Sequence, residues 1–322
     1  MSGNKTVSLA LRFVVSGLIL TVLVTQLPSF EVDDLVPRWT FGAAAWLGIA
    51  GLFTLAAVWL SALRWQKVLE AMEIRAHLPR LFSYYMAGQF ISNVLPTTIG
   101  GDVLRVHRLS RDTGESPGTF ASVVLERLTG WLVLPVITVI GFTINPGLRH
   151  LGSATRVALG LAFATLLALG AVLTAVASRR LGGRLAASAG WRRFAGALHF
   201  GINRLRSHPV AAFNVLAAGF AYQLTLVLAA VAAAQALGLR AAGLTALLAF
   251  FPAVLIAQVL PISMAGLGVR EGAFVLFLGP LGISSADAIA LGLALYLLNV
   301  AVGVLGAPAF AAHTPSHQTL PA

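Results

Sequence analysis

Cysteine is absent from the 322-residue sequence, and charged residues are scarce. The lack of cysteine excludes disulfides, thiolate metal sites and cysteine nucleophiles. Asp, Glu, Lys and Arg make up 10% of the residues, against about 25% in a typical soluble domain. The Walker A, HExxH and GxSxG motifs are missing as well. The sequence therefore predicts no cofactor, no metal site and no hydrolase chemistry.

Apolar residues dominate instead, at 58% of the chain, and the mean hydropathy is +0.87. A helix needs about 20 apolar residues to cross a bilayer. We predict full spans at 9–27, 41–63, 119–143, 156–177, 211–237 and 286–310. Two more apolar stretches, 81–104 and 243–279, are interrupted by proline, glycine and charge. We therefore expect one all-α polytopic membrane domain over 1–322, with six full spans and two hairpins, or eight or more spans if the hairpin legs cross.

The distribution of charge predicts the orientation of the chain. Lys and Arg number 22 against 11 Asp and Glu, and segment 178–209 is rich in arginine without any acid. Because Lys and Arg concentrate in cytoplasmic loops, we expect a multi-pass membrane protein with both termini and the basic loop 178–209 in the cytoplasm. The same rule accounts for the positive charge without a nucleic-acid partner. Trp39 and Trp65, near the two ends of one span, are predicted to be interfacial anchors.

This orientation makes the two interrupted segments re-entrant hairpins. Both flanks of 81–104 lie on the cytoplasmic side, whereas both flanks of 243–279 lie outside. Each of the halves 41–143 and 211–310 then consists of a span, a hairpin and a second span. The two halves run through the membrane in opposite directions. Many transporters are built from inverted repeats of this kind, with the binding site near the midplane at the broken helices.

A direct comparison of the two hairpins supports the inversion. NVLPTTIGGDVLR (93–105) aligns without gaps on QVLPISMAGLGVR (258–270), keeping Val, Leu, Pro, Gly and Arg. Pro96 and Pro261 are expected to end the entering helical leg. The glycines of both stretches are expected to turn the chain tightly. The Val and Leu matches alone carry little weight in so apolar a sequence.

The two aligned arginines are the main candidates for substrate binding. A guanidinium stays charged and holds phosphate in a bidentate manner, so Arg105 and Arg270 are predicted to grip a phospholipid headgroup in one cavity from opposite sides. The alternative is a structural or interfacial role. The other candidate binding residues are polar or glycine: Asn93, Thr97, Thr98, Gly100, Gly101, Asp102, Ser263, Gly266 and Gly268.

A charge network of Glu126, Arg127 and Glu271 is expected beside them. No acid occurs between 128 and 269, so these carboxylates need basic partners from elsewhere in the fold. We expect Glu271 to pair with Arg270 or Arg127, and Asp102 with Arg105. The alternative is that Glu126 and Arg127 form an interfacial pair with a purely structural role.

These motifs resemble the lysylphosphatidylglycerol synthase transmembrane region, also called the flippase-like integral membrane family. The resemblance rests on N-x-x-P-x-x-x-G-G-D-x-x-R from Asn93, E-R-x-x-G from Glu126, and F-P-x(8)-P-x-S-x-x-G-x-G-x-R-E from Phe251. It implies a polytopic inner-membrane protein, and some members move lipids between leaflets. Bifunctional members carry a soluble aminoacyl-transferring domain after the membrane region. Here we expect no such activity, since the sequence given ends at Ala322.

Three functions compete at this point. The first is a lipid transporter or flippase without ATPase, whose partner is a membrane lipid with an anionic or zwitterionic phosphate headgroup. The second is a membrane enzyme acting on lipid-linked phosphate or sugar, with Asp102 or Glu126 as base. The third is an accessory scaffold for enzymes of lipid-linked glycan or envelope lipid synthesis. A paired-carboxylate motif, which the enzyme hypothesis would favour, is missing from the sequence.

Overall fold

A computed structural model describes residues 40–94, 100–177, 192–259 and 266–312, which form helices and no strand. The first half of the chain contains the helices α2 (Phe41–Ala71), α3 (Leu78–Val94), α4 (Gly100–Thr113), α5 (Ser116–Ile144), η2 (Pro146–His150) and α6 (Ser153–Ala177). The second contains α8 (Arg192–Ser207), α9 (Pro209–Ala236), α10 (Leu244–Val259), α11 (Val269–Leu278), η3 (Gly279–Leu281), α12 (Ser285–Val304) and α13 (Ala307–Ala311).

Five helices are long and apolar enough to cross a membrane: α2, α5, α6, α9 and α12. They confirm the all-α polytopic class and match five of the predicted spans within a few residues at most ends. The predicted span 9–27 lies outside the described residues. Two boundaries differ. Helix α2 continues eight residues beyond 63 because no glycine or proline interrupts 52–71, and α12 ends at Val304, where a turn leads into α13.

Local sequence signals set the helix starts. Thr40 and Ser284 cap α2 and α12, each accepting a hydrogen bond of 3.1 Å from a backbone amide three residues on. Proline occupies the first turn of α5 and α9, where its missing amide costs nothing. Pro135 and Pro252 lie inside α5 and α10, as membrane helices tolerate when neighbouring groups satisfy the freed carbonyls.

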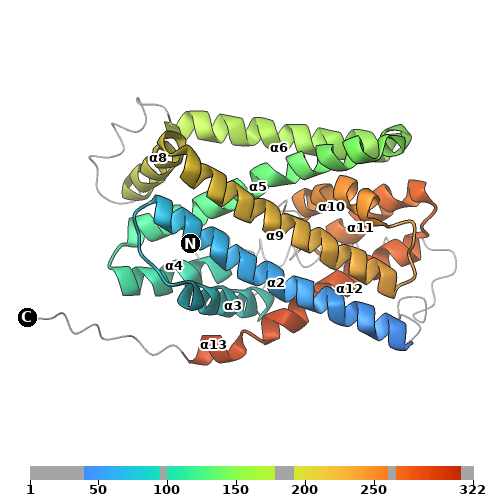
Figure 1. Cartoon of the computed structure of the whole chain (residues 1–322), viewed down its shortest axis with the longest axis horizontal. Helices are drawn as coiled ribbons and strands as arrows, with labels where there is room; N and C mark the ends of the chain where they lie inside the picture. The colour runs from blue at the N-terminus through green and yellow to red at the C-terminus, as the bar shows by residue number, and fades with distance from the viewer. Residues whose placement is uncertain (1–39, 95–99, 178–191, 260–265, 313–322) are drawn as a thin grey trace, which may run out of the picture.

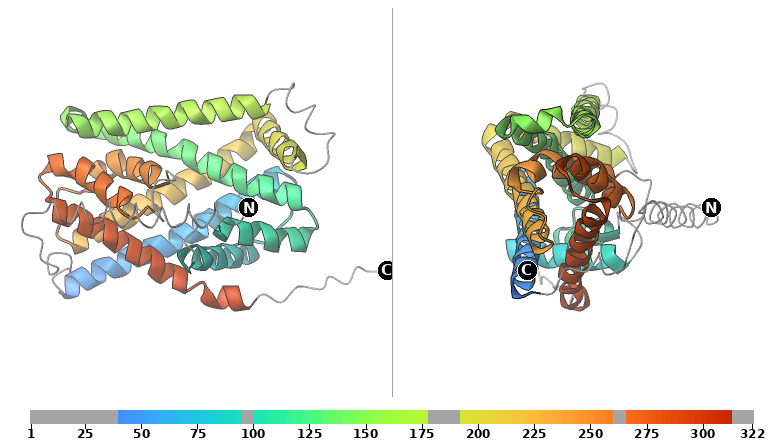
Figure 2. Two further views of the ribbon diagram at one scale, coloured as in Figure 1. Left: turned by 180° about the vertical axis from the view of Figure 1, so that it is seen from behind. Right: turned by 90° about the vertical axis from the view of Figure 1, so that its right-hand side faces the viewer.

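Helices α2 and α9 lie side by side and antiparallel (Figure 1). The α3–α4 pair lies at the end of the bundle where α2 finishes, and the α10–α11 pair lies at the opposite end, where α9 finishes (Figure 1). Figure 2 shows α2 and α9 on one side of the bundle and α12 on the other. The two interrupted segments thus occupy opposite ends of the same bundle.

Small residues and phenylalanines fill the bundle interior. Helix α9 buries a run of alanines against its neighbours. Small side chains let membrane helices approach closely, and this packing takes the place of the hydrophobic effect in holding them together. Around the second interrupted segment, Phe250 stacks on Phe277 at 5.5 Å between ring centroids and meets Phe142 edge-on at 5.3 Å. This apolar core holds α5, α10 and α11 together.

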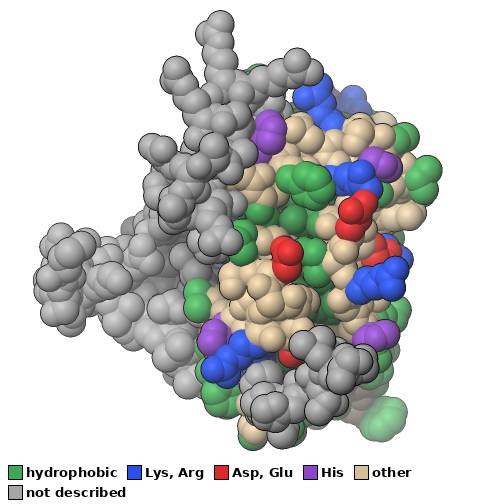
Figure 3. Space-filling view, turned by 90° about the vertical axis from the view of Figure 1, so that its left-hand side faces the viewer, with side chains coloured by type: hydrophobic (Ala, Val, Ile, Leu, Met, Phe, Trp, Pro, Cys, Tyr) green, Lys and Arg blue, Asp and Glu red, His purple; other side chains and the backbone are tan. Residues whose placement is uncertain are grey.

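The end of the bundle that carries α3, α4 and α8 is the more highly charged. Figure 3 views this end and shows Lys, Arg, Asp, Glu and His side chains over it. Segment 178–209, predicted to be a basic loop, contains the helix α8 in its second part. The asymmetry fits the predicted cytoplasmic side, which stays a prediction.

Candidate functional site

A cluster of charged side chains is buried where α2, α4 and α5 meet. Arg64, Arg105 and Glu126 are 4%, 3% and 0% exposed. Arg64 Nε donates to Glu126 Oε1 at 3.0 Å, and its Nη2 bonds to the same oxygen. Arg105 Nη2 donates to Glu126 Oε2 at 3.4 Å. One carboxylate therefore joins two arginines from different helices.

The cluster continues outward through Asp102. This carboxylate accepts from Arg105 on one oxygen and from Arg127 on the other. Asp102 is largely covered, whereas the side chain of Arg127 is 47% exposed. The five residues Arg64, Arg105, Glu126, Asp102 and Arg127, hereafter the first-hairpin cluster, thus run from the interior to the surface.

Aromatic rings surround the two buried guanidinium groups. The Arg105 guanidinium lies over the Tyr85 ring at 4.1 Å and the Trp65 ring at 5.0 Å, and Arg64 lies 4.8 Å from the Tyr222 ring. Tyr85 OH also donates to Glu126 Oε1 at 3.3 Å. Cation–π contacts of this kind stabilise desolvated cations and hold each guanidinium in place.

Gly130, the last residue of the E-R-x-x-G motif, makes room for Arg64. A Cβ added at Gly130 would overlap Arg64 Nη1 and lie 3.1 Å from its Cζ. Because the guanidinium lies directly against the α5 backbone, any side chain at this position would displace it from Glu126. The glycine of the motif is thus explained by the close approach of a cation.

The first-hairpin cluster carries one more positive than negative charge. Its three arginines face two carboxylates. Within the described residues, the Nη1 atoms of Arg64 and Arg105 are buried without a hydrogen-bond partner. Buried donor atoms without a partner are costly, so these two Nη1 atoms are suited to the oxygen atoms of an additional anion.

The second interrupted segment has a different arrangement. Arg270 donates from Nε and Nη2 to Glu271 Oε1, at 3.1 and 2.6 Å, and its guanidinium lies 5.1 Å from the Tyr296 ring. Glu271 Oε2 accepts from the Gly268 amide at 2.6 Å. Both side chains are buried. This second-hairpin pair is neutral, and the carboxylate also caps α11.

The structure brings together some of the predicted site residues. Asp102 pairs with Arg105, and Glu271 pairs with Arg270, whereas Arg127 pairs with Asp102. Arg105 and Arg270 belong to separate sets of contacts, so the shared cavity expected between them stays a prediction. The predicted residues Pro96, Thr97, Thr98, Pro261 and Ser263 lie outside the described residues.

The glycines and Asn93 have more specific roles than the sequence suggested. Gly266 and Gly268 turn the chain as predicted, with φ of +77° and +82°. Gly100 and Gly101 instead begin α4, and a Cβ at Gly101 would overlap the Gly88 carbonyl of α3. Asn93 Nδ2 donates to the Asn299 carbonyl of α12 at 3.4 Å, an interhelical contact.

Four residues of the site were missed or misassigned. Arg64 is not among the residues predicted for the site, and Trp65, predicted to be an interfacial anchor, is fully buried and donates to Ser122 Oγ at 2.9 Å. Tyr85 and Tyr222, whose rings lie against the two buried guanidinium groups, are not among the predicted residues either. The signal for Arg64 was available, because the sequence after 63 contains no helix breaker before the end of α2.

Comparison with known protein families identifies the family of this chain. A search of curated proteins finds no match to the chain. The family description that matches is the lysylphosphatidylglycerol synthase TM region, and the match covers residues 9–306. It contains α2 to α12 together with both charged groups described above. The chain therefore belongs to the lysylphosphatidylglycerol synthase TM-region family of membrane proteins.

Proposed function

We propose that this protein is an inner-membrane lipid transporter that moves a phosphate-bearing lipid between leaflets without an ATPase. The observation that carries the proposal is that Arg64 and Arg105, buried inside a bundle of membrane helices, each keep an Nη1 atom without a hydrogen-bond partner among the described residues. Ionisable groups at such positions usually mark a substrate path. Membership of a family of lipid-related membrane proteins agrees with this choice.

A phosphate headgroup fits the chemistry of the first-hairpin cluster. Guanidinium groups form strong charge-assisted hydrogen bonds with phosphate oxygens, and Arg105 retains a buried Nη1 that no described residue satisfies. Arg127, half-exposed at the outer edge of the cluster, is positioned to meet the headgroup first. We infer that the phosphate passes from Arg127 to Arg105 as the headgroup enters.

The lengths of the hairpin legs support re-entrant segments in inverted repeats. The legs α3, α4, α10 and α11 have 17, 14, 16 and 10 residues, fewer than the roughly 20 needed to span. In addition, α3 ends at Val94 and α10 ends at Val259, which are equivalent positions in the alignment of the two stretches.

A topology experiment tests this part of the proposal. Reporters inserted after Arg111 and after Pro280 are expected to lie on opposite sides of the membrane, since these positions follow the two hairpins. Accessibility labelling in intact cells and in lysed cells provides the measurement. Reporters on the same side would contradict the inverted hairpins.

The transport proposal is tested with Arg105→Gln in liposomes that contain a fluorescent phospholipid. This change removes the surplus charge but leaves each carboxylate an arginine, Arg64 for Glu126 and Arg127 for Asp102. The variant should therefore fold, while lipid movement falls to a tenth or less of the wild-type rate, about 1.4 kcal/mol of lost binding. Thermal unfolding in detergent checks the fold.

Two outcomes would contradict the proposal. If the wild-type protein moves no phospholipid faster than empty liposomes, it is not a transporter of the lipids tested. If Arg105→Gln folds and transports at the wild-type rate, the first-hairpin cluster is not the site. Recovery of chemically altered lipid would instead favour the membrane enzyme.

A further inference from the structure

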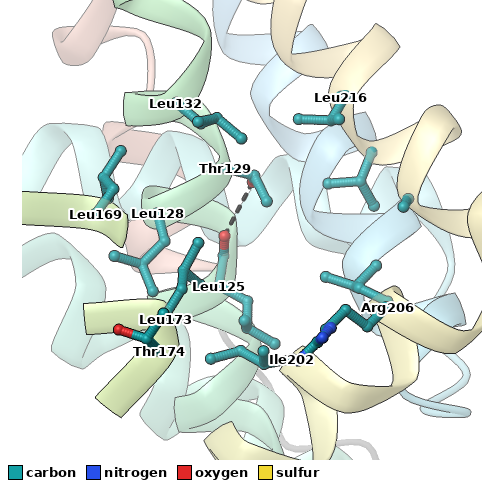
Figure 4. A pocket seen from close by; sticks show the side chains of 13 residues that line it. Leu125, Leu128, Thr129, Leu132, Leu169, Leu173, Thr174, Ile202, Arg206 and Leu216 are labelled. Atoms are coloured by element: carbon teal, nitrogen blue, oxygen red, sulfur yellow. Dashed lines mark hydrogen bonds between the residues drawn. The ribbon is translucent and has the colours of Figure 1, made fainter. Parts of the chain in front are cut away.

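A second feature of the molecule, separate from the charged groups, is an apolar groove of about 400 Å³ between α6 and α9. Figure 4 shows leucines of α5, α6 and α9 pointing into it, with α8 at one end. The lining includes Leu128, Leu132, Leu173 and Leu216. Its volume lies within the range of roughly 300–1,000 Å³ that is common for ligand sites.

Among the described residues, Arg206 of α8 is the one charged residue that lines the groove. The two threonines of the lining, Thr129 and Thr174, donate their hydroxyls to carbonyls of their own helices, as Figure 4 shows for Thr129. Arg206 is exposed, and in Figure 4 its guanidinium lies beside Ile202. The groove is therefore a long apolar surface with a single cation at one end.

Helix α8 is held firmly in this position. A Cβ at Gly201 would overlap Leu125 of α5, so α8 and α5 are in close contact next to Arg206. Ile202 is buried in the same apolar cluster as Leu125 and Val215. His199 Nδ1 further meets the Val176 carbonyl at the end of α6. These contacts fix the backbone of α8, and with it the end of the groove from which Arg206 projects.

The helices that flank the groove have outer faces suited to lipid. On α6, Phe163 and Leu167 are 63% and 58% exposed, and on α9 Phe213 is 70% exposed. Exposed large apolar side chains on membrane helices face acyl chains. A groove between two such faces is open to lipid, and its apolar lining offers water no hydrogen-bond partners.

We propose that this groove binds one acyl chain of an anionic phospholipid, with the lipid phosphate on Arg206. The apolar lining matches the chain, and the single cation matches a negative headgroup at the same end. The site is distinct from the first-hairpin cluster, and it does not depend on whether the protein transports lipid. Arg206 lies at the end of the bundle that is rich in basic residues, where anionic lipid is attracted most strongly.

Photo-crosslinking in vesicles tests the proposal. The full chain is reconstituted with a trace of phosphatidylglycerol that carries a diazirine on one acyl chain, or with the matching phosphatidylcholine probe. After irradiation, labelled peptides are identified by mass spectrometry. Phosphatidylglycerol label is expected on the groove residues Leu128, Leu173 and Leu216. Arg206→Gln should reduce it about fivefold, the effect of one cation near a lipid surface.

Arg240→Gln provides the matched control, because Arg240 is also exposed but lies beyond the far end of α9. It should leave the groove labelling unchanged. The proposal is overturned if label falls outside the groove, if both probes label it equally, or if Arg206→Gln has no effect. Crosslinks from Leu173→Cys to residues 9–27 or to a second copy would also overturn it, since protein would then fill the groove.

Discussion

The two interrupted segments each present a buried arginine, but they neutralise it differently. Around α3 and α4, Arg105 shares Glu126 and Asp102 with two further arginines from α2 and α5. Around α10 and α11, Arg270 has Glu271 to itself, and that carboxylate also bonds to the Gly268 amide. The first group depends on three helices, whereas the second is nearly complete within one.

Residues that align in the two stretches therefore need not share a role. Arg105 and Arg270 occupy equivalent positions in the two sequence stretches, which suggested a symmetrical grip on one headgroup. The surplus charge lies only in the first-hairpin cluster, and the second-hairpin pair is neutral. The proposed phosphate site is therefore formed by the first-hairpin cluster alone, and the second-hairpin pair does not take part in it.

The largest expected effect comes from Glu126→Gln. It removes the carboxylate that joins Arg64 to Arg105 and leaves the buried Arg64 without a carboxylate partner, a loss of about 3–5 kcal/mol. Folded yield and thermal unfolding in detergent provide the measurement. Glu70→Gln on the same end of the bundle is the control, because its pair with Lys67 is exposed. If the two variants lose equal amounts of stability, Glu126 does not hold the cluster together as proposed.

Gly130→Ala should have the next largest effect, about 1–3 kcal/mol, as for other overpacked interiors. The added methyl group would overlap the Arg64 guanidinium, which cannot move without leaving Glu126. Gly170→Ala in α6 is the matched control, since a Cβ there meets no atom within 4 Å and alanine favours the helix. If Gly130→Ala unfolds no earlier than Gly170→Ala, the proposed fit between glycine and arginine is wrong.

The double variant Arg270→Met/Glu271→Gln tests whether the second-hairpin pair contributes to transport. It removes a neutral pair, and the glutamine oxygen still accepts from the Gly268 amide, so stability should change by about 1 kcal/mol or less. Lipid movement in liposomes should stay within twofold of wild type. A tenfold loss of transport in a folded double variant would show that both arginines act on the substrate.

The smallest effect is expected for the pair between Arg204 and Glu73, which is partly exposed. Arg204→Gln should cost about 0–1 kcal/mol, and raising the salt concentration should shrink the difference further because exposed charges are screened. Thermal unfolding at low and high salt measures both. A loss as large as that of Glu126→Gln would mean that surface and buried pairs contribute alike here.

Much of the fold was predictable because hydrophobic length is a local property. Five spans follow from runs of apolar residues, and the Asp102–Arg105 pair follows from a spacing of three on one helix. Arg64 and Glu126 are 62 residues apart, and their contact depends on how α2 packs against α5. No local pattern contains that information, so the sequence alone does not pair Arg64 with Glu126.

Trp65 illustrates the same limit. A tryptophan near the end of a predicted span is usually an interfacial anchor, and this reading is wrong because α2 extends two turns further and turns Trp65 inward onto Ser122. The indole then covers Arg105. Such a role depends on the final length of a helix and on its neighbours.

The contact between Gly88 and Gly101 has a mechanical consequence for the proposed transport cycle. The legs α3 and α4 touch backbone to backbone there, since a Cβ on Gly88 would lie 2.9 Å from the Gly101 carbonyl oxygen. Two legs in such close contact behave as one stiff lever. Access to Arg105 would then change when this lever pivots as a whole against α2 and α5, rather than when its two legs separate.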